Sequence, residues 1–221
     1  FNFDRLSKIS LFLDNPDGKL KKHRHPISLL GGLIILLNLY LIIFSFKLLN
    51  LDNLIFTGEF LYLVILLSTF FYIVGAVDDI KNLSPRLKLF FITLSFLAVV
   101  FFFPDIKLEL IKITFLKKTY YFNNFSVIFL LFSFLLLSNA MNMFDGINLQ
   151  LIFFSIFIFV VFIIKSFLPL FFLTLTISLL ILGVLNFKNK VFLGDGGCYL
   201  LSSIIGCTFI YQYKYLYNYL Y

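Results

Sequence analysis

The residues of this chain that could do chemistry gather in four short polar segments between long apolar runs. Carboxylates supply the hard oxygen ligands that suit Mg²⁺, and a carboxamide oxygen can join them. A nearby lysine would neutralise phosphate, and glycines at a helix start leave backbone N–H groups to meet an anion. The sequence therefore predicts a site for a Mg²⁺-bound diphosphate, made of Asp78, Asp79, Lys88, Asn142, Asp145, Asp195 and the glycines Gly194, Gly196 and Gly197.

Composition indicates which elements must position these residues. The chain has 221 residues, of which 61% are apolar and only 13% are charged, against roughly 25% charged in typical soluble domains. This excludes a disordered chain, a coiled coil, a disulfide scaffold and an ordinary soluble domain. The net charge of +7 is better explained by charges that orient membrane spans than by binding to nucleic acid. We expect an all-α, polytopic membrane protein, surrounded by lipid, in which residues 1–221 form one domain.

Seven apolar runs have about the length of a helix that crosses a bilayer. Apart from Lys47 they contain no Asp, Glu, Lys or Arg. Residues 106–114 instead alternate apolar and polar side chains, which predicts a strand in a short hairpin outside the membrane. The predicted spans are 29–49, 60–77, 89–104, 125–140, 149–164, 168–187 and 197–213.

Because consecutive spans alternate in direction, counting them sorts the connections between the two sides of the membrane. One side holds residues 1–28 and the loops 78–88, 141–148 and 188–196, with 11 of the 18 lysines and arginines. The positive-inside rule makes that side cytoplasmic. Taken alone, each polar segment is more simply a solvated loop, a turn or a helix end. All four fall on one side in a count made without reference to them, and this coincidence favours a site.

In order and spacing, these segments resemble the polyprenyl-phosphate N-acetylhexosamine-1-phosphate transferases of glycosyltransferase family 4. The family pattern is Lys-x-His…Gly-Gly, an Asp-Asp loop ending in Lys, Asn-Ala-x-Asn-x-x-Asp-Gly, and Phe-x-Gly-Asp-x-Gly. The resemblance is closer to O-antigen and teichoic-type enzymes than to the muramoyl-pentapeptide transferase, because Asn148 stands where many bacterial members have Asp. The matching residues are Lys21, His23, Gly31, Gly32, Asp78, Asp79, Lys88, Asn139, Asn142, Asp145, Gly146, Phe192, Gly194, Asp195 and Gly196.

The resemblance implies a reaction at a bacterial inner membrane, with the active-site loops cytoplasmic. A UDP-HexNAc donor gives HexNAc-1-phosphate to undecaprenyl (polyprenyl) phosphate and UMP leaves, as the first membrane step of cell-envelope polysaccharide synthesis. Mg²⁺, or Mn²⁺ in its place, is the implied cofactor. The implied roles are metal binding by Asn142 and Asp195, neutralisation of the diphosphate by Lys88, and positioning or deprotonation of the lipid phosphate by Asp78 and Asp79.

The resemblance also assigns supporting roles. Asp145 supports the site, Phe192 stacks on uracil and Asn148 forms a hydrogen bond to it. The remaining substrate-binding residues that it implies are Lys21, His23 and Asn82.

The chain departs from the family pattern in length. Family members have further spans and a late cytoplasmic loop rich in His or Arg, so we expect a fragment of a protein with 10–11 helices or a shortened relative. A truncated, inactive membrane scaffold is therefore one alternative. A transporter is a weaker alternative, because transporters place ionisable groups at mid-membrane and these spans almost entirely lack them. The sequence leaves open the HexNAc, the polymer, direct displacement against a covalent intermediate, and the oligomeric state, a homodimer included.

Overall fold

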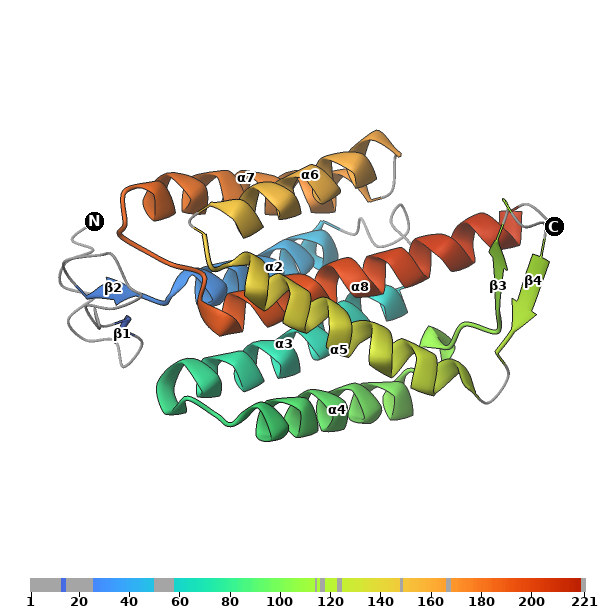
Figure 1. The fold of residues 1–221 in the computed structure, drawn as a ribbon. Helices are drawn as coiled ribbons and strands as arrows, with labels where there is room; N and C mark the ends of the chain where they lie inside the picture. The colour runs from blue at the N-terminus through green and yellow to red at the C-terminus, as the bar shows by residue number, and fades with distance from the viewer. Residues whose placement is uncertain are drawn as a thin grey trace.

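The computed structural model describes residues 13–14, 26–49, 58–113, 115, 118–122, 125–147, 149–165 and 168–219. Within these ranges the chain is mainly helical (Figure 1). The helices are α2 (Gly31–Leu48), α3 (Gly58–Lys81), α4 (Pro85–Phe102), α5 (Ser126–Phe144), α6 (Gln150–Ile164), α7 (Pro169–Phe187) and α8 (Gly194–Tyr219). The short strands β1 (Leu13–Asp14) and β2 (Ile27–Ser28) pair with each other, and a 3₁₀ turn, η2 (Pro104–Ile106), follows α4.

The helical, polytopic membrane architecture expected from the sequence is confirmed. In the described part of the chain, α2, α3, α4, α5 and α7 are long and apolar enough to cross a membrane. Helix α6 is apolar but has only 15 residues, and α8 has 26 residues and a Tyr-rich end. The outward faces carry large apolar side chains, such as Phe101 and Phe187, as expected for surfaces in contact with lipid.

Several helices run further than the apolar runs that predicted them. Helix α3 continues to Lys81, α5 continues to Phe144, and α8 begins at Gly194. Helix α4 begins at Pro85, a residue that suits the first helical position because its missing N–H has no helical partner there. The polar segments that were expected in loops therefore lie largely in the first and last turns of helices.

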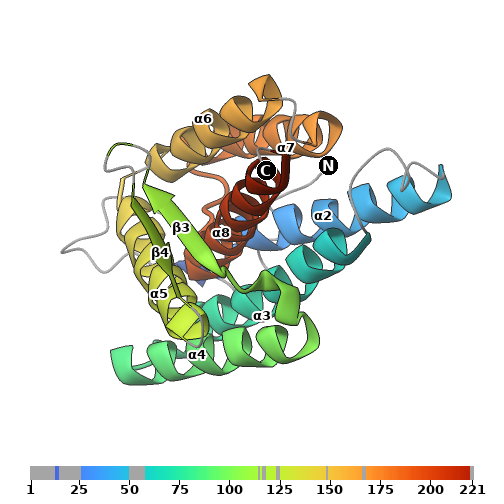
Figure 2. The same ribbon diagram turned by 90° about the vertical axis from the view of Figure 1, so that its right-hand side faces the viewer.

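Helix α8 lies in the middle of the bundle. Figures 1 and 2 show it surrounded by the other helices, and it contacts α2, α3, α5 and α6. Helices α6 and α7 pack together on one side of it, and α3 packs against α4 on another. Its side chains from Cys198 to Leu201 are fully buried. The part of α8 that follows the polar site is therefore enclosed by protein.

Small residues allow the neighbouring helices to approach α8 closely, as is common between membrane helices. A Cβ added at Gly32 of α2 would lie 2.5 Å from the backbone nitrogen of Gly197. A Cβ added at Gly75 of α3 would lie 2.4 Å from the carbonyl oxygen of Asp195. The glycines Gly32 and Gly75, which lie opposite the start of α8, are thus explained by backbone packing.

Serine hydroxyls add hydrogen bonds between the same helices. The hydroxyls of Ser138 on α5 and Ser202 on α8 are 3.0 Å apart, and Ser203 on α8 donates to Ser68 on α3 at 2.9 Å. All four serines are buried. Such bonds fix the rotation of α8 against α3 and α5.

The strand predicted within 106–114 is confirmed in its second half. Strand β3 (Leu110–Ile113) pairs antiparallel with β4 (Lys118–Tyr121), while Ile106 belongs to η2. The hairpin contacts the far end of α8, because the backbone N–H of Lys112 donates to the Tyr213 hydroxyl at 2.8 Å. Helix α8 is thus tied to the hairpin at one end and to the polar site at the other.

Candidate active site

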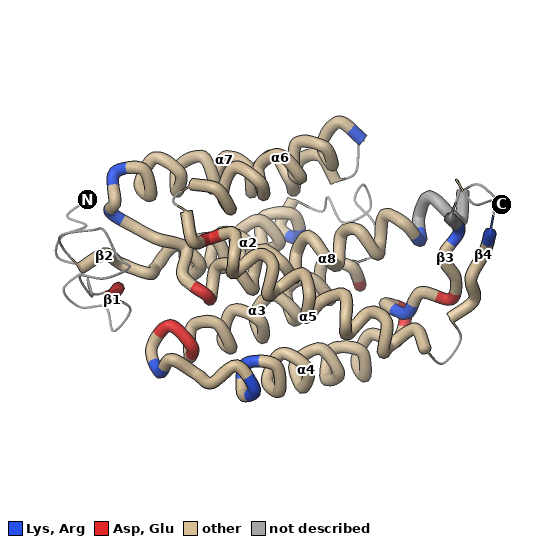
Figure 3. Tube along the Cα trace, viewed as in Figure 1, with Lys and Arg blue, Asp and Glu red and all other residues tan. Residues whose placement is uncertain are grey.

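Helix ends from distant parts of the chain meet at one end of the bundle. The last turns of α3 and α5 and the first turns of α4 and α8 lie there, and their charged residues cluster together in Figure 3. The hairpin lies at the opposite end, as Figure 1 shows. The alternation of spans predicted that Asp78, Asn142 and Asp195 lie on one side, and the helices place them at the same end of the bundle.

Lys88 joins two carboxylates from different helices. Its ammonium group forms an ion pair with Asp78 of α3 and a second one, at 3.4 Å, with Asp195 of α8. Asp78 is buried, and its other oxygen accepts the backbone N–H of Leu83 at 2.8 Å. A buried carboxylate is costly unless it is paired in this way. One cation therefore connects α3, α4 and α8.

Asp79 faces a different partner from that of its neighbour Asp78. Its Oδ1 accepts the backbone N–H of Asp195 at 2.9 Å, and its Oδ2 accepts the backbone N–H of Gly196 at 3.1 Å. The sequence predicted that N–H groups at this helix start would meet a substrate anion. For the N–H of Gly196 that prediction is wrong, because the carboxylate of Asp79 already binds it.

Asp145 and Asn142 reach the start of α8 from α5. Burial raises the pKa of the Asp145 carboxyl to about 7; the Cys198 thiol, which donates a hydrogen bond to it, opposes this shift, and the charge of Asp79 adds to it. The side-chain nitrogen of Asn142 donates to the Tyr199 hydroxyl at 3.5 Å, which is a long hydrogen bond. Both predicted site residues therefore face α8, the helix that carries Asp195.

The loop before α8 is fixed by backbone pairing with the start of α2. Phe192 receives the N–H of Gly31 on its carbonyl at 3.0 Å and donates its own N–H to the carbonyl of Ser28 at 2.8 Å. Gly32 donates to the carbonyl of Leu193 at 3.1 Å. The two glycines that the sequence singled out thus hold the segment that leads into Asp195. The stacking of Phe192 on uracil stays a prediction.

The other predicted substrate contacts are placed only in part. Asn82 is exposed in the turn between α3 and α4, where its φ of 49° suits an asparagine. Lys21, His23 and Asn148 lie outside the described residues.

Two positioning residues escaped the sequence analysis. The buried Asn186 of α7 accepts the N–H of Leu149 at 3.2 Å, and Leu149 has a left-handed φ of 69° just after the Asp145 segment. Tyr199 is fully buried beside Asn142. A polar residue inside an apolar run was the signal that could have revealed Asn186.

The donor atoms suit Mg²⁺ bound through a substrate. Among the described residues, no three side chains of His, Cys, Asp or Glu form a ready-made metal cluster. In phosphate chemistry Mg²⁺ commonly takes only one or two protein carboxylates and completes its shell with phosphate oxygens and water. Asp195 offers a carboxylate oxygen and Asn142 an amide oxygen, so the two predicted ligands are of the right kind.

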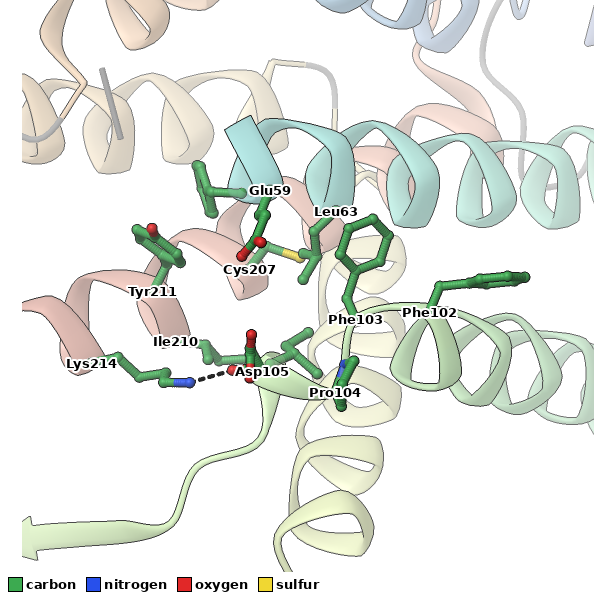
Figure 4. A pocket seen from close by; sticks show the side chains of 12 residues that line it. Glu59, Leu63, Phe102, Phe103, Pro104, Asp105, Cys207, Ile210, Tyr211 and Lys214 are labelled. Atoms are coloured by element: carbon green, nitrogen blue, oxygen red, sulfur yellow. Dashed lines mark hydrogen bonds between the residues drawn. The ribbon is translucent and has the colours of Figure 1, made fainter. Parts of the chain in front are cut away.

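Two cavities of the described structure lie away from this site. One, of about 300 Å³, lies at the hairpin end between α3, η2 and α8 (Figure 4). It is lined partly by Glu59 and Asp105, and there Lys214 donates to the backbone carbonyl of Asp105. The second, of about 340 Å³, is an apolar groove between α5 and α8 that includes Gly206. Neither of these two cavities includes Asp78, Lys88 or Asp195.

No curated protein matches the chain. The sequence profile of glycosyl transferase family 4 matches residues 61–213, more than half of the chain, and this segment contains Asp78, Lys88 and Asp195. The chain therefore belongs to glycosyl transferase family 4, a family of membrane phosphoglycosyl transferases that transfer a phosphosugar to polyprenyl phosphate.

Proposed function

We propose that this chain transfers HexNAc-1-phosphate from UDP-HexNAc to undecaprenyl phosphate at the cytoplasmic face of a bacterial inner membrane. A phosphate oxygen of the lipid attacks the phosphorus that bears the sugar. The bond from that phosphorus to the UMP phosphate breaks, and UMP leaves with the bridging oxygen. The product is a lipid-linked diphosphosugar, as the first membrane step of an envelope polysaccharide requires.

The observation that supports this proposal best is the ammonium group of Lys88 between Asp78 and Asp195. Transfer of a phosphoryl group between two anions depends mainly on positioning and on neutralisation of charge. A diphosphate oxygen can take the place of one carboxylate beside Lys88 without leaving the cation unpaired. The longer contact, at 3.4 Å to Asp195, is the one that a substrate would replace more easily.

Asp195 and Asn142 are the residues that would hold Mg²⁺, which when bound neutralises the donor diphosphate. Asn142 directs its side-chain nitrogen toward Tyr199, so its side-chain oxygen is the atom suited to a cation. Asp78 then keeps Lys88 in place, because its contact with that lysine is buried on α3. Asp145 supports the first turn of α8 through the Cys198 thiol.

The location of the site matches the two substrates. A nucleotide sugar arrives from water and a polyprenyl phosphate from the bilayer, so their reacting phosphates meet at the membrane surface. The cluster lies at the ends of apolar helices, where the charged residues of α3, α4 and α8 are concentrated (Figure 3). Groups at these helix ends can contact a lipid phosphate without drawing it into the hydrocarbon layer.

The test is UMP release by the chain reconstituted in liposomes with undecaprenyl phosphate, Mg²⁺ and either UDP-GlcNAc or UDP-GalNAc. We expect turnover with one donor, its loss in EDTA, and a decrease of about 100-fold or more in Lys88→Met and Asp195→Asn. The matched control is Lys118→Met, the same change on the exposed strand β4 at the other end, which keeps wild-type turnover.

Two results would overturn the proposal. Absence of turnover with both donors, in a preparation that is folded by circular dichroism, would favour the inactive scaffold. Undiminished turnover in Lys88→Met would remove the assigned role of the lysine.

A further inference from the structure

We infer that Asp79 is a positioning residue, whose carboxylate holds the first turn of α8 so that Asp195 faces Lys88. This inference rests on the proposed function, and it replaces the role at the lipid phosphate that the sequence suggested for Asp79. The two adjacent aspartates then have separate tasks. Asp78 binds the cation, and Asp79 binds the backbone that carries the opposite carboxylate.

The hydrogen bonds of Asp79 are those of a helix cap supplied by another helix. Both of its oxygens accept N–H groups from the first turn of α8, at 2.9 and 3.1 Å. Such N–H groups have no partner within their own helix, and a carboxylate there also meets the positive end of the helix dipole. The residue before α8 is Leu193, which has no side-chain oxygen to act as the cap. Asp79 therefore meets a need that the local sequence leaves unmet.

Gly194 is shaped to receive this carboxylate. Its φ is +69°, and a Cβ there would lie 2.6 Å from Oδ2 of Asp79. Gly75 lies one helical turn before Asp79 on the same face of α3, since residues four apart are neighbours on a helix. Its missing Cβ leaves room for the carbonyl of Asp195. Helix α3 thus holds Asp195 from two adjacent points, one through hydrogen bonds and one through close packing.

The arrangement explains why Asp78 and Asp79 cannot exchange roles. Successive residues of a helix point about 100° apart, since a turn contains 3.6 residues. Asp78 points to Lys88, to the side chain of Asp195 and to the turn at Leu83, while Asp79 points to the backbone of α8. A carboxylate held by two backbone N–H groups is fixed against α8 and is not free to turn toward a lipid phosphate.

Kinetics of Asp79→Asn and Asp79→Ala separate positioning from base catalysis. Asparagine cannot act as a base, and its single side-chain oxygen can keep one of the two backbone hydrogen bonds that Asp79 accepts. We therefore expect Asp79→Asn to keep kcat within about tenfold of wild type with an unchanged pH profile. Asp79→Ala should lose about 100-fold in kcat, as a displacement of reacting groups by about 1 Å does. Equal loss in both variants, with the acidic limb of the profile gone in Asp79→Asn, would overturn the inference.

A second measurement does not depend on activity, because the chain has only two cysteines and both are in α8. Cys198 lies just inside the capped turn, and Cys207 lies further along the helix. We expect methyl methanethiosulfonate to modify Cys198 roughly tenfold faster in Asp79→Ala, since loss of a cap opens the first turn. Asp79→Asn, which keeps one of the two hydrogen bonds, should show a smaller increase than Asp79→Ala, and Cys207 should be unchanged in both.

The two measurements separate the two proposals. If the wild type transfers no sugar phosphate, the proposed function fails, and the modification rate of Cys198 still decides whether Asp79 holds α8. If Asp79→Ala leaves that rate unchanged, the positioning role is wrong whatever the enzyme does.

Discussion

The substitution Gly75→Ala measures how closely α3 must approach the start of α8. A methyl group at this position would lie 2.4 Å from the carbonyl oxygen of Asp195 and 2.5 Å from the nitrogen of Gly196. Ordinary van der Waals contact begins near 3.4 Å, so the two helices must move apart by about 1 Å. The atoms in the way belong to backbone, which cannot rotate aside as a side chain could.

The expected cost follows from two opposing effects. Overpacking a tight contact costs about 1–3 kcal/mol, while alanine in place of glycine in a helix returns at most about 1 kcal/mol. We therefore expect the free energy of unfolding to fall by about 1–2 kcal/mol. The same movement lengthens the hydrogen bonds from Asp195 and Gly196 to Asp79, now 2.9 and 3.1 Å, beyond the useful range. Turnover should fall together with stability.

The assay is thermal unfolding in detergent followed by circular dichroism, with UMP release on the same preparations. Gly183→Ala in α7 is the matched control, because the nearest atom to its added Cβ is a side-chain carbon of Ile152 at 3.5 Å. That variant should be neutral or slightly stabilised and fully active. If Gly75→Ala unfolds at the wild-type temperature with wild-type turnover, the close approach of α3 and α8 described above is wrong.

Burial raises the pKa of Asp145 to about 7, so the folded protein holds a proton there that the unfolded chain releases near pH 4. The free energy of unfolding should therefore fall as the pH rises from about 4 to about 7, and Asp145→Asn should flatten this part of a thermal-unfolding profile; an unchanged slope would contradict the burial effect. Ser138→Ala should lower the free energy of unfolding by about 0.6 kcal/mol, because the hydrogen bond to Ser202 is lost. The hydroxyl of Ser133 bonds only within its own helix, so Ser133→Ala should not have this effect. If both variants lose the same stability, the bond between Ser138 and Ser202 contributes nothing. A topology reporter at Tyr120 should be periplasmic and one at Asn189 cytoplasmic, and the reverse would refute the orientation.

Side-chain patterns predicted a large part of the fold. Long apolar runs located the helices, and alternation between 106 and 114 located the first strand of the hairpin. Hydropathy could not predict that α3 continues through Asp78 and Asp79 to Lys81, because helix hydrogen bonds belong to the backbone and continue past the last apolar side chain.

The sequence predicted which residues belong to the candidate site, but it did not predict which of them contact each other. The alternation of spans placed Asp78, Asn142 and Asp195 on one side without any structure. The partner of Asp79 lies 116 positions away, at the backbone of Asp195, and nothing in a single sequence reports such a pairing. Gly75 attracted no notice for the same reason, since its importance comes from what lies opposite it in space.

Helix α8 is hydrogen-bonded to other elements near both of its ends, so the fold sets the distance between these two contacts. One lies at Asp195, and the other lies at Tyr213, where the hairpin bonds to the helix. At 1.5 Å per residue these points are about 27 Å apart, close to the roughly 30 Å of a bilayer's hydrocarbon layer. In a bilayer with shorter or longer acyl chains, either the whole bundle must tilt or one of these two contacts must be strained. The catalytic rate should therefore vary with acyl-chain length. It should be greatest where the thickness of the hydrocarbon layer matches the distance between the two contacts of α8.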